Sequence, residues 1–374
     1  MGIYSLDNWF DEPAGRPFNI AGPCSAESEE QVLETARLIS GECRPALFRS
    51  GLWKPRTRPD TFSGVGSKGL KWLMKVKEQT GMRVTVEAAS TRHVELCLRA
   101  GIDALWLGAR TVSNPFSVQE IAESLRGVDI PVLVKNPLNP DIDLWIGALE
   151  RINNAGINKL AAVHRGFSPY EKTRYRNMPK WEIPVELRRR IKDIPIICDP
   201  SHISGDVRLV PELAQKAMDL NMDGLMVEVH RQPSLALSDG VQQLSPAGYC
   251  DMMKNLVVRR SQPEDPGFLD YLEELRNQVD SVDQQLVDLL ARRLEIIDLI
   301  GEYKSRNNVA VLQMDRWLQI LKTRLRQAGL SGLDRSFTEK YLKLLHQESI
   351  RRQTEIMRKM KEEKDGSGDK GPDK

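Results

Sequence analysis

The sequence lacks the long apolar runs that mark membrane-spanning and exported proteins. No stretch of its 374 residues approaches about 18 consecutive apolar residues, so we expect no transmembrane helix and no membrane partner. Residues 1–11 mix acidic and apolar side chains, without the basic start and apolar core of a signal peptide. The five cysteines are odd in number and lack the spacing of a disulfide framework. Together these absences predict a reduced, cytoplasmic protein.

A strong charge of one sign is also absent. The chain has 54 Lys and Arg residues against 52 Asp and Glu residues, which gives a formal net charge of +2. This balance argues against a general nucleic-acid binder, although local basic clusters can still occur. We therefore expect small-molecule substrates and no nucleic-acid partner.

The chain does contain a regular alternation of short β-rich runs and helical patterns between residues 18 and 230. The predicted strands are 18–24, 47–52, 83–88, 104–109, 131–136, 159–165, 194–199 and 224–229. The predicted helices between them are 28–40, 67–79, 91–100, 117–126, 141–155, 184–192 and 206–220. Eight such units in about 250 residues predict an α/β fold, the (β/α)8 TIM barrel. A doubly wound open sheet is the structural alternative.

The composition changes at residues 259–267. Two prolines and a glycine among polar residues predict a linker there. Apolar residues then recur at close to a 3.5-residue spacing through 268–306, which predicts a long amphipathic helix. Shorter patterns near 314–328 and 334–360 predict two more helices.

These patterns divide the chain into domains. We expect a barrel domain over residues 1–258, an all-α domain of three helices over 268–360 and a charged, disordered tail over 361–374. The apolar stripe of the first helix is too long for two shorter helices of the same chain to cover. We therefore predict a homodimer, or a higher homo-oligomer, that forms through the helical domain.

Polar side chains follow several predicted strands at their C-terminal ends. Cys24, His202 and Glu228 lie at the ends of the first, seventh and eighth strands, and Asp239 lies in the loop beyond the eighth. These strands are neighbours in a closed barrel, so the four side chains can converge. One thiolate, one imidazole and two carboxylates suit Mn²⁺, Fe²⁺, Co²⁺ or Zn²⁺. A lone cysteine in a strand is more often a core residue, and His230 could replace His202 as a ligand.

Basic residues gather at the same strand ends. The set is Arg49, Lys54, Arg56, Arg110, Lys135 and Arg165. Three of them directly end apolar strands, where a buried cation needs an anionic partner. Arginine suits bidentate phosphate binding, and several cations predict more than one anionic group. Solvated surface charge is the alternative for each residue, and Lys135 alone could instead be the Schiff-base lysine of a barrel aldolase.

Several motifs in this half of the chain resemble those of 3-deoxy-D-arabino-heptulosonate-7-phosphate (DAHP) synthases. They are Lys54-Pro55-Arg56-Thr57, Gly108-Ala109-Arg110, Lys135-Asn136, His164-Arg165-Gly166 and Asp199-Pro200-Ser201-His202. The resemblance covers about residues 15–255 and is to the branch related to 3-deoxy-D-manno-octulosonate-8-phosphate (KDO8P) synthase. It implies a metal-dependent condensation of phosphoenolpyruvate with erythrose 4-phosphate. The Lys-Pro-Arg-Thr motif favours this aldose over arabinose 5-phosphate.

The resemblance also implies roles for individual residues. The metal ligands would be Cys24, His202, Glu228 and Asp239. Phosphoenolpyruvate would be held by Arg49, Lys54, Arg110, Lys135 and Arg165. Arg56 and Thr57 would hold the phosphate of the aldose, and Lys54 would donate a proton to the new alkoxide. Some members of this branch carry an N-terminal regulatory domain; because the barrel pattern begins near residue 18, we expect none here.

Charged and polar residues interrupt the apolar helices beyond the linker. Arg293 and Lys304 are 11 residues apart, almost three whole turns, so they share a helix face. Ser349 and Gln353 are four residues apart and share a face of the last helix. Arg276 lies about 100° round from Arg293, so it would serve a different site. Ordinary solvated helix charge is the alternative for any one of these residues.

As a set these residues resemble those of the all-helical chorismate mutases. The matching segments, within about residues 268–357, are Leu275-Arg276, Leu289-Leu290-Ala291-Arg292-Arg293 and Gly301-Glu302-Tyr303-Lys304 on the first helix, with Arg316, Ser349 and Gln353 on the other two. The resemblance implies the rearrangement of chorismate to prephenate in an intertwined dimer. Arg276 would enter the partner's site, and Arg293, Lys304 and Gln353 would stabilise the transition state.

Two positions depart from the mutase pattern. Gln313 and Trp317 stand where acidic residues are common, and both positions should lie on the hydroxyl side of the substrate. We therefore expect reduced mutase activity or altered affinity.

The combined interpretation is a bifunctional enzyme of aromatic amino-acid biosynthesis, in the shikimate pathway. It would be a transferase in the barrel and an isomerase in the helices, with feedback inhibition through the helical domain. The alternative for the helices is a regulatory binding and dimerisation module with little mutase activity. The alternatives for the barrel are a KDO8P synthase and a Schiff-base aldolase.

Overall fold

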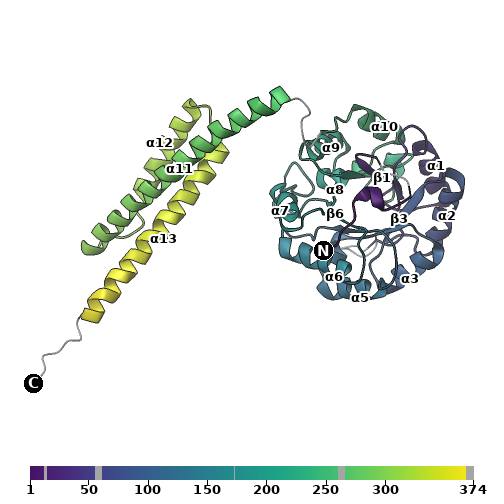
Figure 1. Ribbon diagram of the computed structural model, residues 1–374, viewed down its shortest axis with the longest axis horizontal. Helices are drawn as coiled ribbons and strands as arrows, with labels where there is room; N and C mark the ends of the chain where they lie inside the picture. Colours follow the sequence, from purple (N-terminus) through teal and green to yellow (C-terminus); the bar gives the residue numbers. More distant parts are fainter. Residues whose placement is uncertain (12–14, 55–60, 172, 260–265, 368–374) are drawn as a thin grey trace, which may run out of the picture. The chain divides into compact units, whose positions relative to one another are not determined.

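The computed structural model describes residues 1–11, 15–54, 61–171, 173–259 and 266–367 (Figure 1). The chain divides into two compact units, Met1–Ser261 and Gln262–Lys374. In the described part of the chain, no helix is long and apolar enough to cross a membrane.

Within the described residues, the first unit is a closed barrel of eight parallel strands. The strands are β1 (Phe18–Gly22), β2 (Leu47–Arg49), β3 (Arg83–Glu87), β4 (Ala104–Leu107), β5 (Val132–Lys135), β6 (Leu160–His164), β7 (Ile196–Cys198) and β8 (Gly224–Glu228). Each strand pairs with the next, and β8 pairs back with β1 from Phe18↔Gly224 to Gly22↔Glu228. This closure confirms the predicted (β/α)8 barrel and excludes the open sheet.

Helices connect the strands around the barrel (Figure 1). They are α1 (Glu29–Ile39), α2 (Lys68–Thr80), α3 (Thr91–Ala100), α4 (Ala109–Val112), α5 (Pro115–Ser124), α6 (Ile142–Asn154), α7 (Glu182–Arg190), α8 (Pro200–Ser204), α9 (Val210–Asp219) and α10 (Pro246–Asn255). Three helices, α1, α3 and α6, are capped at their N-termini by Ser28, Ser90 and Asp141. Each capping side chain accepts a hydrogen bond from the backbone N–H three residues further along the chain. The short helix α8 begins directly after β7, because Asp199 caps it and Pro200 occupies its first position.

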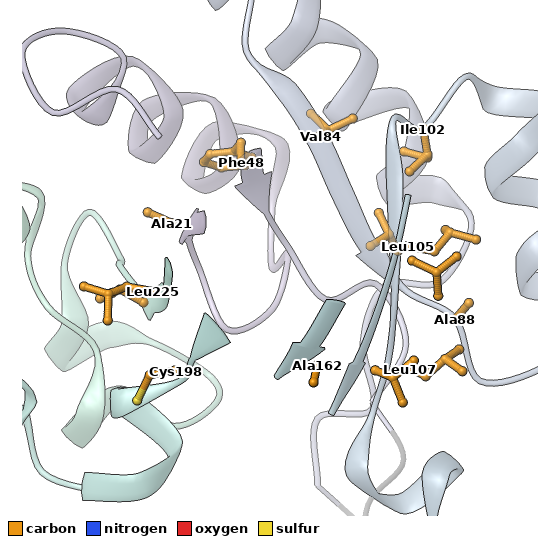
Figure 2. Packing of buried hydrophobic residues seen from close by; sticks show 14 of the residues in the cluster. Ala21, Phe48, Val84, Ala88, Ile102, Leu105, Leu107, Ala162, Cys198 and Leu225 are labelled. Carbon is orange, nitrogen blue, oxygen red and sulfur yellow. The ribbon is translucent and has the colours of Figure 1, made fainter. Parts of the chain in front are cut away.

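The side chains of each strand alternate between two cores. Ile20 and Met226 point into the barrel, and Trp9, from the segment before β1, completes this inner core. Their neighbours Ala21 and Leu225 point outward and pack in the larger core between strands and helices (Figure 2). The period of two along each strand therefore decides which residues can reach the barrel interior.

One pair of cysteines departs from the prediction of a fully reduced chain. Cys43, between α1 and β2, and Cys250, on α10, form a disulfide with Cα atoms 5.3 Å apart. They are 207 residues apart in sequence, and closure of the barrel brings the first and last βα units together. The prediction is therefore wrong for this pair, whereas Cys24, Cys97 and Cys198 are free and buried.

The second unit consists of helices, which are α11 (Pro266–Arg306), α12 (Met314–Leu330) and α13 (Arg335–Ser367). Helix α13 packs along both α11 and α12. It also extends into the segment 361–374 that the composition predicts as a disordered tail, so residues 361–367 are helical instead. Residues 260–265 of the predicted linker and 368–374 of the predicted tail lie outside the described residues.

These helices bury little apolar surface within one chain. Val279, Leu289 and Leu299 on α11 are 58%, 62% and 63% exposed. Ala328 is the one buried apolar residue among those that the structure describes in this unit. Large apolar side chains that stay exposed along a helix are typical of interaction surfaces.

Candidate active sites

The alternation of strand side chains aims polar residues into the C-terminal mouth of the barrel. Arg49, Lys135 and Glu228 each follow an inner-core residue by two positions, at the ends of β2, β5 and β8. Arg165 and Asp199 continue the same alternation one residue past β6 and β7. All five are buried. The fold thus collects these charges at the end of the barrel where active sites of this architecture form.

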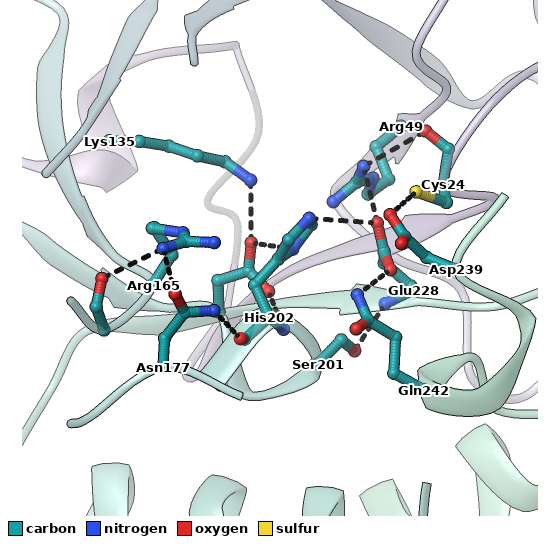
Figure 3. Close-up of polar contacts among 12 residues, drawn as sticks. Cys24, Arg49, Lys135, Arg165, Asn177, Ser201, His202, Glu228, Asp239 and Gln242 are labelled. Carbon is teal, nitrogen blue, oxygen red and sulfur yellow. Dashed lines mark hydrogen bonds and ion pairs between the residues drawn. The ribbon is translucent and has the colours of Figure 1, made fainter. Parts of the chain in front are cut away.

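Cys24, His202, Glu228 and Asp239 converge at this mouth (Figure 3). Their ligand atoms lie within 4.8 Å of one another; Cys24 Sγ is 3.1 Å from Asp239 Oδ2, and His202 Nε2 is 3.6 Å from Glu228 Oε1. Asp199 Oδ2 is 2.8 Å from His202 Nδ1, which turns Nε2 toward the group. A carboxylate behind a histidine is the usual arrangement at metal sites. The residues present therefore fit a divalent metal ion with mixed sulfur, nitrogen and oxygen ligands.

Burial and neighbouring charges control protonation in this group. Burial raises the pKa of the Cys24 thiol, and the Glu228 carboxylate raises it further. Burial opposes the ionisation of Asp239, but His202 and Lys54 hold the pKa of this carboxyl below its usual range. A cation among these residues would favour the Cys24 thiolate, because coordination stabilises the deprotonated sulfur.

A cavity of about 960 Å³ opens above this group. The basic residues that line it are Lys54, Arg110, Lys135, Arg165, Arg174 and Arg176. His202 and Asp239 line it too, so two of the four candidate metal ligands face the same space as the cations. Lys135 Nζ is 2.7 Å from Asp199 Oδ2, which is a buried ion pair. Burial lowers the pKa of Arg165 to about 10, and an anion in the cavity would offset that cost.

Arg49 is buried at this mouth with incomplete pairing. Its Nη2 lies 3.2 Å from Glu228 Oε1, and its guanidinium carbon lies 5.0 Å from the centroid of the Trp106 ring. Within the described residues, Arg49 Nε and Nη1 have no hydrogen-bond partner. Unpaired charged donors are costly in a buried site, so the geometry favours an anionic ligand beside them.

The helical unit brings together part of the predicted mutase set. Arg293 Nη1 on α11 donates to Ser349 Oγ on α13 at 2.9 Å. Gln353 Nε2 donates to the backbone oxygen of Ser349 at 3.2 Å, while its Oε1 is buried and has no partner in the described part of the chain. Gly301 allows this approach, since a Cβ atom there would lie 3.2 Å from Gln353 Cα. Arg293, Ser349 and Gln353 therefore meet between two helices.

Lys304 and Gln313 line a separate, mainly apolar cavity of about 420 Å³. Burial lowers the pKa of Lys304, whose Nζ donates to the backbone oxygen of Val311 at 2.7 Å. The Lys304 side chain is thus held against the helical unit by this bond.

Arg276 and Arg316 do not join this set within one chain. The Arg276 side chain is 62% exposed and lies 3.5 Å from Glu273. Arg316 is exposed and donates to Gln319 Oε1 at 2.8 Å on its own helix. Both arginines are available to a second protomer.

Trp317 has a packing partner instead of the polar role that is common at its position. Its ring stacks on His346, with centroids 3.9 Å apart and an interplanar angle of 7°. Burial lowers the pKa of His346, and Arg293 lowers it further. The charge of Arg293 therefore acts on one ring of the stacked pair.

Two family models match the chain. The DAHP synthetase I family matches residues 14–259, and chorismate mutase type II matches residues 275–354. The chain belongs to the DAHP synthetase I family. It fuses that domain to a chorismate mutase type II domain.

Individual relatives agree with this assignment. A phospho-2-dehydro-3-deoxyheptonate aldolase from Thermotoga maritima is 36% identical over 225 residues, which cover 60% of this chain and 64% of the relative. A 2-dehydro-3-deoxyphosphooctonate aldolase from Azoarcus sp. is 27% identical over 260 residues, covering 64% and 88%. The crystal structure of the Thermotoga maritima DAHP synthase matches with a TM-score of 0.57 and 33% identity, covering 63% and 67%. The chain thus spans less than two thirds of the length of the Thermotoga relative.

The DAHP synthetase I domain also contains a cavity residue that the motifs did not identify. Glu87, at the end of β3, lines the cavity and accepts a bond from Trp106 Nε1 at 3.1 Å. Gly108 leaves room for it, because a Cβ atom there would lie 2.1 Å from Glu87 Oε1. The signal was available in the sequence: Val84 and Val86 face the outer core, so Glu87 must face inward.

The loop after β6 supplies two further residues. Arg176 lines the cavity and donates to Asp239 Oδ1 at 2.9 Å. Asn177 Nδ2 donates to the backbone oxygen of His202 at 2.6 Å. No periodic pattern predicts side-chain directions in such a loop. Arg56 and Thr57, by contrast, were predicted from a motif but lie outside the described residues.

Proposed function

We propose that the barrel condenses phosphoenolpyruvate with erythrose 4-phosphate to give DAHP and inorganic phosphate. The observation that carries this proposal is the cavity in which several cations lie beside His202 and Asp239, two members of the group of four candidate metal ligands. Membership of the DAHP synthetase I family supports the same reaction.

The cations divide between the two substrates. Phosphoenolpyruvate has a phosphate and a carboxylate, and the residues that hold it are Arg49, Lys54, Arg110, Lys135 and Arg165. Arg56 and Thr57 hold the phosphate of erythrose 4-phosphate. Cations fixed by the fold orient two anions that would otherwise repel each other, which lowers the entropic cost of bringing them together.

Cys24, His202, Glu228 and Asp239 hold a divalent ion, which is Mn²⁺, Fe²⁺, Co²⁺ or Zn²⁺. When bound, the ion supplies Lewis-acid polarisation of the aldehyde oxygen. Asp199 fixes the imidazole of His202, since its carboxylate lies 2.8 Å from Nδ1.

Lys54 is the proton donor of the condensation. The C3 carbon of phosphoenolpyruvate attacks the aldehyde carbon, and the aldehyde oxygen becomes an alkoxide that takes a proton from Lys54 Nζ. Although burial opposes its charge, Cys24 and Glu228 raise the pKa of Lys54, so this residue carries the proton before the reaction. Water then adds at C2, and phosphate leaves by cleavage of its C–O bond.

Two other barrel activities make different demands on the site. A KDO8P synthase would use arabinose 5-phosphate in the same cavity. A Schiff-base aldolase would need the Lys135 amine free to attack a carbonyl, but its Nζ lies 2.7 Å from Asp199 Oδ2 in an ion pair.

One assay separates these activities. Phosphoenolpyruvate loss and phosphate release are measured with erythrose 4-phosphate and with arabinose 5-phosphate. We expect one phosphate per phosphoenolpyruvate consumed, and a kcat/KM at least about tenfold higher with erythrose 4-phosphate. A preference for arabinose 5-phosphate would make the barrel a KDO8P synthase, and borohydride trapping at Lys135 would make it a Schiff-base aldolase.

We further propose that the helical unit rearranges chorismate to prephenate. The reaction is unimolecular, so the site needs to hold a dicarboxylate in a compact conformation rather than supply a nucleophile. Arg293 and Arg276, the latter from a second protomer, bind the carboxylates, and Lys304 and Gln353 stabilise the ether oxygen. Ser349, Gln313 and Arg316 contact the rest of the substrate. The dimer that this requires is supported by the exposed apolar face of α11.

A regulatory role for the same site makes a separate prediction. Chorismate or prephenate bound to the helical unit would lower the rate of DAHP formation. Chorismate absorbance is followed with the full chain and with Arg293→Ala. Loss of chorismate that depends on Arg293 supports the mutase, whereas inhibition of the barrel by prephenate without loss of chorismate would leave only the regulatory module.

A further inference from the structure

The loop between His230 and Leu244 carries one of the four candidate metal ligands in an unusual backbone conformation. The loop leaves β8 and returns to the barrel through a bridge between Val229 and Leu244. Within it, Asp239 has φ of 53°, the left-handed region that non-glycine residues rarely adopt. The position of the Asp239 carboxylate therefore depends on contacts that hold the loop.

Gln243 ties this loop to the segment that carries Cys24. The backbone N–H of Cys24 donates to Gln243 Oε1 at 3.0 Å. Gln243 Nε2 donates to the backbone oxygen of Ser238, the neighbour of Asp239, at 2.8 Å. Gln243 is 1% exposed, so both bonds are shielded from water. One amide thus joins the backbone of Cys24 to that of Ser238, the residue before Asp239.

Gln242 connects to the two carboxylates of the candidate metal group, Glu228 directly and Asp239 through Arg176 (Figure 3). Its Nε2 donates to Glu228 Oε2 at 2.7 Å, and its Oε1 accepts a bond from Arg176 Nη1 at 2.7 Å. Arg176 Nη1 also donates to Asp239 Oδ1 at 2.9 Å. Gln242 and Arg176 therefore link Glu228 to Asp239. The bonds use Glu228 Oε2 and Asp239 Oδ1, whereas Glu228 Oε1 lies near His202 and Asp239 Oδ2 lies near Cys24.

We propose that Gln242 and Gln243, here called the glutamine pair, position Cys24, Glu228 and Asp239 around the divalent ion without binding it. The inference rests on the metal site of the proposed function. The dipeptide bonds directly to Cys24 and Glu228, and it reaches Asp239 through Arg176 and the backbone of Ser238. An amide suits the task because it donates and accepts at once, and a neutral group adds no charge to the ligand set.

The test uses the full chain and Co²⁺ as the probe ion, because thiolate-to-Co²⁺ charge transfer reports on Cys24 by absorbance. Gln242→Met and Gln243→Met remove the amide bonds at nearly constant volume. Gln119→Met, on the exposed face of α5, is the matched control, and Cys24→Ala defines the spectrum without the thiolate band. The readouts are the Co²⁺ dissociation constant and the band intensity per bound ion, which excludes misfolded chain that binds no ion.

We expect each glutamine variant to weaken Co²⁺ binding about 10- to 100-fold, the usual cost of losing groups that orient metal ligands. Gln243→Met should also reduce the thiolate band per bound ion, whereas Gln242→Met should leave that band intact. Affinities within twofold of the wild type and of Gln119→Met would overturn the role of the glutamine pair and leave the metal site standing. A wild-type chain that binds Co²⁺ without a Cys24-dependent band would instead overturn the metal site itself.

Discussion

The two units of this chain bury opposite kinds of residue. The barrel encloses apolar side chains such as Trp106, Leu133 and Met226, which are fully buried, and it buries charged residues such as Arg49 and Glu228 at one mouth. In the described part of the helical unit, the buried residues outside glycine are Ala328, Thr338, Ser349 and Gln353, while apolar residues such as Leu289 remain exposed. One unit has an apolar core within the chain, whereas the other buries mainly polar groups.

This difference indicates that the two units reach their functional form by different routes. The described residues of the barrel mouth come from the strand ends and loops of a single chain. The helical unit leaves apolar side chains exposed, and Arg276 is exposed beside Glu273, so the mutase site that we propose would need a partner. The stability and the activity of the helices should then depend on protein concentration, as in obligate dimers.

The largest expected effect breaks the barrel and spares the helices. Lys135→Met removes a cavity cation and leaves the buried Asp199 carboxylate without its 2.7 Å partner. We expect DAHP formation to fall on the order of 1000-fold, since charged groups aligned in a buried site contribute the most to catalysis. Chorismate consumption by the same preparation should stay within twofold of the wild type. A parallel fall in both rates would show that the substitution acts through folding.

The converse substitution breaks the helices and spares the barrel. Arg293→Ala removes the cation that donates to Ser349, one of the two arginines proposed to bind the carboxylates of the substrate. We expect chorismate consumption to fall about 100-fold or more, and the DAHP rate without added chorismate to remain unchanged. Arg292→Ala, on a neighbouring exposed position of the same helix, is the control and should have little effect.

A charge on the exposed apolar face tests the need for a partner. Leu289 is 62% exposed in one chain, so Leu289→Asp should barely affect a monomer. In a dimer that covers this face, burying the new carboxylate should raise the dissociation constant about 10- to 100-fold, by about 1.4 to 2.8 kcal/mol. Analytical ultracentrifugation over a dilution series measures the shift. Unchanged association would move the interface to another surface.

The smallest effect concerns the close approach of α11 and α13. A Cβ atom at Gly301 would lie 3.2 Å from Gln353 Cα, so Gly301→Ala should force the helices apart by a few tenths of an ångström. We expect a loss of about 1 kcal/mol in the stability of the helical unit, because overpacking outweighs the gain in helix propensity. Thermal unfolding checks this. The control is Gly329→Ala, near the end of α12, where a Cβ atom meets nothing within 4 Å.

Much of the fold was predictable because its signals are periodic. The eight strands and their intervening helices repeat at regular spacing, and the predicted closure follows from their number. The same periodicity brings Cys24, His202 and Glu228 together, since each ends or follows a strand at one mouth. The alternation along β3 also predicts that Glu87 faces the cavity, although Glu87 belongs to none of the motifs.

Contacts made by loops and by distant segments were not predictable in this way. The bonds of Gln242, Gln243 and Arg176 depend on how two loops cross the barrel mouth. The Cys43–Cys250 disulfide depends on closure of the barrel over 207 residues. The spacing of residues in the sequence predicts neither the loop contacts nor the disulfide, because side chains in loops follow no fixed period.

The most direct test of the metal site in the barrel is a paired assay before and after metal removal. One preparation of the full chain is assayed for DAHP formation and for chorismate consumption, then treated with a chelator and assayed again. We predict that chelation abolishes DAHP formation, that Mn²⁺ or Co²⁺ restores it, and that chorismate consumption is unchanged throughout. DAHP formation that persists in the metal-free chain would show that Cys24, His202, Glu228 and Asp239 do not form a catalytic metal site.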